Sequence, residues 1–449
     1  MLFNKILVAN RGEIAIRVMR AARELGIKTV AVYSDADKEA THVKYADEAF
    51  PIGPAPSNLS YLHIPNIINA AVQTGAEAIH PGYGFLSENH HFAAVCQTWG
   101  IKFIGPPAEA IEKMGIKAQA RQMMMEAGVP VVPGTAGTVE TIGEAKRIAE
   151  EIGYPVMVKA SFGGGGRGIR VVESPDELEE ALERASREAK SAFGQGDVYL
   201  EKYLRQPRHI EIQVLADNHG HVITLGERES SLQRRRQKIL EEAPSVAMTF
   251  DLRQRMSQAA IRAAKAVNYT SAGTLEFLLD QNGQFYFMEM NTRVQVEHTC
   301  TEMITGIDIV KEQIRIAADL PLSVEQNDVE LRGWAIECRI NAEDPANQFR
   351  PSPGNVTVWK EPGGPWVRVD SGAEPGYQVQ PFYDSLLAKL VTWGRNRDEA
   401  IERMRRALSE FTIEGVKTTL DLHKQLMQDP DFCSGRIHTN FLAERIKGA

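Results

Sequence analysis

Short apolar runs alternate with amphipathic stretches along the first 115 residues. The runs KILVA, KTVAVY, EAIH and KFIG are separated by helical patterns at residues 12–25, 62–74 and 88–98. This alternation predicts an N-terminal α/β domain, in which helices cover a parallel sheet. The first turn, Asn10-Arg11-Gly12, is not GxGxxG, so a Rossmann-like fold without NAD is predicted.

From residue 116 a second domain begins, with a glycine run between two strand patterns. YPVMVKA precedes SFGGGGRG and IRVV follows it, so the loop joins strands and is not a Walker A loop. Four glycines, Gly163 to Gly166, allow backbone N–H groups to close over phosphate oxygens. We therefore expect a flap over a nucleotide, with Lys117 and Lys159 as phosphate ligands; a flexible loop with solvated lysines is the alternative.

Helix starts and further strands surround this loop. Thr141 with Glu144, and Ser174 with Glu177, have the capping-box form. YLEKYL and HIEIQVLA are expected to form a strand pair. The basic run Arg234, Arg235, Arg236 and Lys238 indicates an anion site, or else a surface run paired with Glu227, Glu229, Glu241 and Glu242.

The segment 274–297, TLEFLLDQNGQFYFMEMNTRVQVE, predicts a β-hairpin around Asn282-Gly283. Both residues tolerate the positive φ of a two-residue type I′ turn. Such a turn places Gln281 opposite Gln284.

This register also places Glu276 opposite Glu289. Opposed carboxylates repel by roughly 3 kcal/mol at an effective dielectric near 20. With Asn291 nearby, the oxygen-rich set favours Mg²⁺ or Mn²⁺ between them; an edge hairpin with solvated charges is the alternative. One strand face is expected to carry Glu289, Asn291, Arg293, Gln295 and Glu297, opposite Met288, Met290, Val294 and Val296.

The last third is predicted to contain a helix at 302–318, a strand at 333–341, a β-rich segment at 345–395 and a helix at 397–410. In GWAIECRIN, Glu337, Arg339 and Asn341 share one face of the strand.

Composition narrows the class of protein. The length of 449 residues indicates about three domains, and the net charge of −8 argues against a general nucleic-acid or membrane-surface binder. Four scattered cysteines without CxxC, and the lack of a signal or membrane-span pattern, favour a cytoplasmic protein.

Together these motifs indicate ATP-driven activation of a small acid. In their order KILVANRGEIAIR, HPGYGFLSEN, KASFGGGGRG, QRRRQK, EMNTRVQVEH and ECRINAED, they resemble the biotin carboxylases of the ATP-grasp superfamily. The resemblance implies three domains: 1–115 (Rossmann-like, pre-ATP-grasp), 116–330 (ATP-grasp, with a glycine-rich lid at about 130–205) and 331–449 (β-rich, C-terminal).

By that resemblance, ATP and bicarbonate form carboxyphosphate and the carboxyl group passes to biotin. Mg²⁺ (or Mn²⁺) is expected at Glu276, Glu289 and Asn291. ATP is expected at Lys117, Lys159, Gly165, Gly166, Glu201, Lys202, His209, Gln233, Glu276 and Glu289. Bicarbonate and biotin are expected at Lys238, Arg293, Gln295, Val296, Glu297, Arg339 and Tyr83. The catalytic residues are expected to be Glu297, Arg339, Lys238 and Arg293, with Glu297 as the base and Arg339 stabilising the biotin enolate.

Phe162, Ser230, Arg236, Ile116 and Thr299 depart from common family forms. The chain lacks a biotin-attachment motif. The resemblance therefore implies a homodimeric subunit that works with a biotin carboxyl carrier protein and carboxyltransferase subunits, in acetyl-CoA carboxylase and fatty acid synthesis. The alternatives are the same subunit of another acyl-CoA or pyruvate carboxylase, a different ATP-grasp ligase, and a nucleotide-binding regulatory subunit without turnover.

Overall fold

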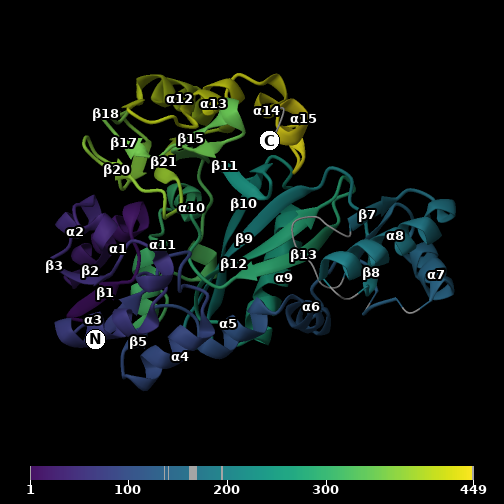
Figure 1. Ribbon diagram of the computed structural model, residues 1–449, viewed down its shortest axis with the longest axis horizontal. Helices are drawn as coiled ribbons and strands as arrows, with labels where there is room; N and C mark the ends of the chain where they lie inside the picture. The colour runs from purple at the N-terminus through teal and green to yellow at the C-terminus, as the bar shows by residue number, and fades with distance from the viewer. Residues whose placement is uncertain (1, 136, 140, 161–168, 194–195, 447–449) are drawn as a thin grey trace. The chain divides into compact units, whose positions relative to one another are not determined.

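The computed structural model describes residues 2–135, 137–139, 141–160, 169–193 and 196–446 (Figure 1). The chain forms two compact units. The first consists of Met1–Val129, Arg208–Leu278 and Glu289–Ala449, and the second of Pro130–Pro207 and Leu279–Met288. Among the described residues, no helix is long and apolar enough to cross a membrane.

The N-terminal part of the first unit is a parallel sheet in the order β3-β2-β1-β4-β5. Its strands are β1 (Lys5–Val8), β2 (Lys28–Ser34), β3 (Glu48–Gly53), β4 (Ala78–His80) and β5 (Lys102–Phe103), and its helices are α1 (Gly12–Glu24), α2 (Thr41–Tyr45), α3 (Ile64–Thr74), α4 (His90–Thr98) and α5 (Ala108–Gly115). Ile6 and Val8 pack with α1, whereas Leu7 packs with α3 and α4. Helices therefore cover both faces of the sheet, as predicted.

The sequence pattern missed β3. This strand contains Pro51 and pairs only with β2, at the sheet edge. An edge strand tolerates proline because one side of its backbone needs no partner, so an edge strand can lack the expected apolar run.

The second unit is built on an antiparallel sheet in the order β7-β6-β8. Its elements are α7 (Ile142–Ile152), β6 (Val156–Ala160), β7 (Ile169–Val172), α8 (Pro175–Phe193) and β8 (Val198–Lys202). The Thr141 side chain caps α7 by accepting from the Glu144 N–H, as predicted. Strands stand on both sides of the glycine run, as predicted, but Phe162, Gly165 and Gly166 lie outside the described residues.

An eight-stranded sheet has the order β13-β12-β9-β10-β11-β14-β21-β19 and belongs to the first unit except for residues 279 and 285–288 at its β12–β13 end, which fall in the second. The strands are β9 (Arg208–Ala216), β10 (Val222–Arg234), β11 (Gln237–Ala243), β12 (Ser271–Leu279), β13 (Phe285–Asn291), β14 (Trp334–Asn341), β19 (Val367–Ser371) and β21 (Leu386–Gly394). The expected pairing of YLEKYL with HIEIQVLA is wrong, because β8 and β9 belong to different sheets. The chain passes from one unit to the other between Pro207 and Arg208.

Helices and short strand pairs complete the first unit. The helices are α6 (Lys117–Glu126), α9 (Phe250–Ala266), α10 (His298–Thr305), α11 (Ile309–Ala317), α12 (Arg397–Glu410), α13 (Leu420–Leu426), α14 (Pro430–Cys433) and α15 (Phe441–Arg445). The strand pairs are β15 (Glu343–Asp344) with β16 (Arg350–Pro351), β17 (Gly354–Asn355) with β20 (Gln378–Val379), and β18 (Val358–Lys360) with β22 (Thr412–Glu414). The single helix predicted at 302–318 is instead two, because Gly306 ends α10 at φ +72° and Asp308 caps α11.

Candidate active site

Lys238 is the cation at the centre of the site. From β11 its Nζ lies 2.7 Å from Glu276 Oε1 on β12 and 2.7 Å from Glu297 Oε1 in the turn before α10, and it also pairs with Glu211 on β9. Burial opposes the charge of the ammonium, but the three carboxylates raise the pKa of Lys238 above its ordinary value. The cross-strand order of the sheet thus gathers acidic residues from three segments around one lysine.

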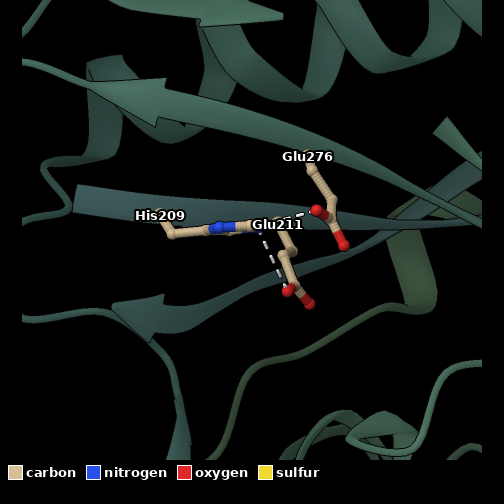
Figure 2. Close-up of side chains that lie close together, drawn as sticks. All are labelled: His209, Glu211 and Glu276. Carbon is tan, nitrogen blue, oxygen red and sulfur yellow. Dashed lines mark ion pairs between the residues drawn. The ribbon is translucent and has the colours of Figure 1, made fainter. Parts of the chain in front are cut away.

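His209, Glu211 and Glu276 lie on two neighbouring strands and point toward one another (Figure 2). His209 Nε2 is 3.0 Å from Glu276 Oε2 and 3.5 Å from Glu211 Oε1. The Gln233 amide donates to His209 Nδ1 at 2.8 Å, which leaves the ring hydrogen on Nε2. A protonated nitrogen cannot ligate a metal, and Glu211 is already paired with both Lys238 and Arg228, so the triad is part of the hydrogen-bond and ion-pair network around Lys238.

Sequence reasoning missed Glu211 and Arg228. Both are buried, and Arg228 Nε lies 3.1 Å from Glu211 Oε2, while its other nitrogens donate to Gln295 at 2.7 Å and to Thr301 at 2.9 Å. Strand β9 is buried on both faces, so its alternation of apolar and polar residues gives no sign of a site. Burying an unpaired charge in such a strand is costly, so the charged residues in these apolar strands could have been expected to form buried ion pairs.

Arg339 on β14 is the second cation at Glu297. Its Nη2 lies 2.9 Å from Glu297 Oε2 and also pairs with Glu241 on β11. Burial raises the pKa of the Glu297 carboxyl, but the charges of Lys238 and Arg339 outweigh it and hold that pKa well below its ordinary value. Glu297 is therefore an ionised carboxylate between two cations.

The hairpin differs from the prediction at its turn. Asp280 N–H donates to Gln284 O at 2.8 Å, and Gly283 has φ +75°, whereas Asn282 keeps a negative φ. The turn is a three-residue connection with glycine in the left-handed position. The two-residue type I′ turn, and the register counted from it, are wrong.

Glu276 and Glu289 nevertheless interact. Burial and the Glu276 charge raise the pKa of Glu289, whose only ion pair among the described residues is with the exposed Lys117, at 3.9 Å. Asn291 Nδ2 donates to Glu276 Oε1 at 2.7 Å. Two mutually repelling carboxylates beside a side-chain amide are a donor set that fits a hard divalent cation.

The strand ends at Asn291, so the expected continuous face out to Glu297 is wrong; of the residues placed on the opposite face, Met288 is exposed and Met290 is buried. The following loop still brings its residues to the site. Gln295 Nε2 donates to Glu276 Oε1 at 2.8 Å, and Arg293 Nη2 donates to Asn291 Oδ1 at 2.8 Å. These residues are therefore brought to the site by the loop after β13 and not by the alternation of side chains along a strand.

Tyr83 reaches this loop through two buried charges. Its hydroxyl donates to Glu13, Glu13 pairs with Lys389 at 3.1 Å, and Lys389 Nζ donates to Val296 O at 3.1 Å. The structure therefore links Tyr83 and Val296, two residues predicted to lie at one subsite.

Other predicted residues lie elsewhere. In the second unit, Lys159 pairs with Glu201, and Lys202 Nζ donates to Gly153 O at 2.7 Å. The basic run divides: Lys238 enters the site, Arg234 lies over the Phe349 ring, and Arg235 and Arg236 are exposed in the turn. The four glutamates suggested as partners of the run pair with other arginines, namely Arg253, Arg208, Arg339 and Arg397.

Comparison with known families identifies three segments of the chain. Residues 2–111 match the biotin carboxylase N-terminal domain, residues 117–325 the ATP-binding domain of the carbamoyl-phosphate synthase L chain, and residues 337–444 the biotin carboxylase C-terminal domain. These matches show a three-domain architecture.

Relatives match over the whole chain. Biotin carboxylase 1 of Bacillus subtilis is 57% identical over 98% of both chains, and a pyruvate carboxylase subunit of Methanothermobacter thermautotrophicus is 58% identical over 100% of this chain and 91% of its own. A solved biotin carboxylase domain dimer of Hydrogenobacter thermophilus 2-oxoglutarate carboxylase, bound to MgADP, ADP and bicarbonate, is 53% identical with a TM-score of 0.89, covering 99% of this chain and 98% of that one.

Proposed function

The chain belongs to the biotin carboxylase family of ATP-dependent ligases, and from that premise we propose that it is the biotin carboxylase subunit of an acetyl-CoA carboxylase. In this proposal it carboxylates biotin on a separate carrier protein, using MgATP and bicarbonate, and the carboxyltransferase subunits then use the product in fatty acid synthesis. We extend the proposal to a homodimer with domains at 1–115, 116–330 and 331–449. The dimer of the 2-oxoglutarate carboxylase relative supports the homodimer.

The convergence of Lys238 and Arg339 on the buried Glu297 carries the proposed chemistry. A bicarbonate ion bound to both cations would weaken their electrostatic stabilisation of the Glu297 carboxylate, and this would raise the pKa of Glu297. Glu297 then takes the bicarbonate proton. The freed oxygen forms a bond to the γ-phosphorus of ATP, ADP leaves, and carboxyphosphate results. Lys238 and Arg293 hold the anion throughout.

The C–O bond of carboxyphosphate next breaks, the released phosphate takes the N–H proton of the ureido group of biotin, and the carboxyl group forms a bond to that nitrogen. Arg339 is proposed to stabilise the negative charge that develops on the ureido oxygen of biotin, with Tyr83 near the ring. Glu276, Glu289 and Asn291 would hold Mg²⁺, which neutralises phosphate charge when bound. Lys117, Lys159, Gly165, Gly166, Glu201, Lys202, His209 and Gln233 are proposed around ATP.

The test is phosphate release from MgATP, measured with and without bicarbonate and with and without free biotin. We expect release that requires bicarbonate and rises with biotin. Glu297→Gln should retain ATP binding and lose at least 100-fold of the bicarbonate-dependent rate, because general-base catalysis typically contributes 10²–10⁴-fold. Release that is independent of bicarbonate would contradict the proposal.

The 58% identity to a pyruvate carboxylase subunit favours a second candidate, the same reaction within a pyruvate carboxylase. Carrier proteins purified from each type of complex distinguish the two candidates. The proposed function predicts a higher kcat/KM with the acetyl-CoA carboxylase carrier.

A further inference from the structure

Two buried carboxylates face each other directly behind Arg339. In the antiparallel pair of β11 with β14, Glu241 stands opposite Glu337, and both side chains are fully buried. Directly opposed side chains lie about 4.5–5.5 Å apart at Cβ, and like charges there are destabilising. The arrangement needs either a cation between the two carboxylates or a proton.

The available cation does not serve both carboxylates. Arg339 Nη2 pairs with Glu241 Oε1 and with Glu297, and no ion pair of Glu337 is present among the described residues. Lys389 pairs with Glu13 and Asp370 instead. One guanidinium therefore stands beside three carboxylates, and a buried uncompensated charge is costly.

Hydrogen bonding indicates where a proton belongs. The Thr299 hydroxyl donates to Glu337 Oε2, so that oxygen is an acceptor. Glu337 Oε1 and Glu241 Oε2 are buried, and neither has a hydrogen-bond partner within the part of the chain that the structure describes. A single hydrogen on one of these two oxygens, donated to the other, would satisfy both.

We propose that Glu241 and Glu337 share one proton, and that this protonated pair is a positioning device that holds Arg339 against Glu297. The inference rests on the proposed function. It assigns roles to Glu241, Glu337 and Thr299, none of which contacts substrate in the proposed reaction. Without the shared proton, two opposed charges compete with Glu297 for the guanidinium, and Arg339 leaves its position.

The surrounding charges agree with this assignment. Burial raises the pKa of Glu241 to about 7 despite Arg339, and burial together with the Glu241 charge raises the pKa of Glu337 well above its ordinary value. The charged and titratable groups that face the pair are Lys238, Arg339, Glu297, Lys389, Cys300 and Cys338. The pair should therefore lose its shared proton as the pH rises, and turnover should fall with that loss.

The experiment compares the full-length wild type with E337Q, T299V and E242Q, using two measurements. Infrared spectroscopy follows the carbonyl band of a protonated carboxylic acid against pH and needs no turnover, so its result stands even if the proposed function fails. Biotin-dependent phosphate release is measured against pH and normalised to the maximum of each enzyme. Its fall at high pH is called the alkaline limb. Glu242 is the matched control, because it is a fully buried glutamate on the same strand that pairs with Arg397 instead.

We expect an acid band in the wild type that disappears as the pH rises, in parallel with the loss of turnover. E337Q should lack both the band and the alkaline limb, because its amide cannot ionise, and E242Q should retain both. T299V removes a donor that favours the ionised form, so both midpoints should move to higher pH. An E337Q band and limb identical to the wild type, or T299V midpoints that do not move, would overturn the proposal; if E337Q does not fold, T299V decides alone.

Discussion

At the residue scale, the site depends on a few buried charges that cannot be removed singly. Lys238 forms ion pairs with Glu211, Glu276 and Glu297, and all three glutamates are buried away from solvent. Removing one partner of a buried pair costs about 3–5 kcal/mol, because the remaining charge stays buried. These residues therefore couple activity to stability.

Lys238→Met should abolish bicarbonate-dependent phosphate release and lower the free energy of unfolding by about 3–5 kcal/mol. The matched control is Arg397→Met, which removes another buried cation from its carboxylate, Glu242. We expect the control to lose similar stability while keeping bicarbonate dependence, as measured by urea unfolding and phosphate release. A Lys238→Met enzyme with normal turnover would contradict the role of Lys238.

Glu289→Gln and Glu211→Gln separate the two possible metal positions. The Glu211 oxygens are already paired with Lys238 and Arg228, whereas Glu289 is repelled by Glu276 and, among the described residues, forms an ion pair only with the exposed Lys117. We expect Glu289→Gln to raise the Mg²⁺ concentration for half-maximal activity about tenfold, roughly 1.4 kcal/mol of binding free energy. Mn²⁺ binding, followed by electron paramagnetic resonance, should weaken in the same variant.

Glu211→Gln should leave Mn²⁺ affinity near that of the wild type. The opposite ranking, with loss of binding in Glu211→Gln alone, would place the ion in the triad of His209, Glu211 and Glu276.

At the element scale, periodicity predicted several of the helices and strands, but not β10 or α9, and it did not predict how the strands pair. The parallel N-terminal sheet and the helix Arg397–Glu410 follow directly from spacing. The predicted type of the hairpin turn is wrong because Asn-Gly is compatible with both two-residue and three-residue turns, and the local sequence does not distinguish between them. Glu241 opposite Glu337 joins strands almost a hundred residues apart. No local pattern contains that information.

Helix α12 gives a direct test of local structure. The Asn396 side chain accepts a hydrogen bond from the Glu399 N–H at 2.9 Å and caps the helix, which packs against β14 and β21. Asn396→Ala should destabilise the protein by about 1 kcal/mol, while Asn396→Ser keeps an acceptor and most of the stability. Thermal unfolding checks the ranking, and equal midpoints for the two variants would show that the cap contributes nothing.

At the scale of the whole molecule, acid should destabilise the fold through its buried histidines. Burial lowers the pKa of His42 and His423 to about 4, and of His80 and His298 to about 3. In the unfolded chain each protonates near pH 6.5. Their contribution is therefore fully present above pH 6.5 and is lost as the pH falls toward 4.

The expected loss is up to about 1.4 kcal/mol per pH unit for each histidine. Thermal midpoints measured at pH 7.5, 6.5 and 5.5 should show a plateau followed by a decline. His42→Gln should flatten the decline, whereas replacement of the exposed His91 with glutamine should not. A stability that stays constant down to pH 5 would contradict this account.

The eight-stranded sheet also bears on how such chains diversify. Strands β9 to β12 lie in the segment that matches the ATP-binding family, and β19, β21 and β14 from Glu337 onward lie in the C-terminal segment, yet β11 and β14 pair directly. A recombination event that exchanged the C-terminal segment between relatives would have to preserve the side-chain pairs between β11 and β14, including Glu241 and Glu337. The two segments are therefore expected to be inherited together.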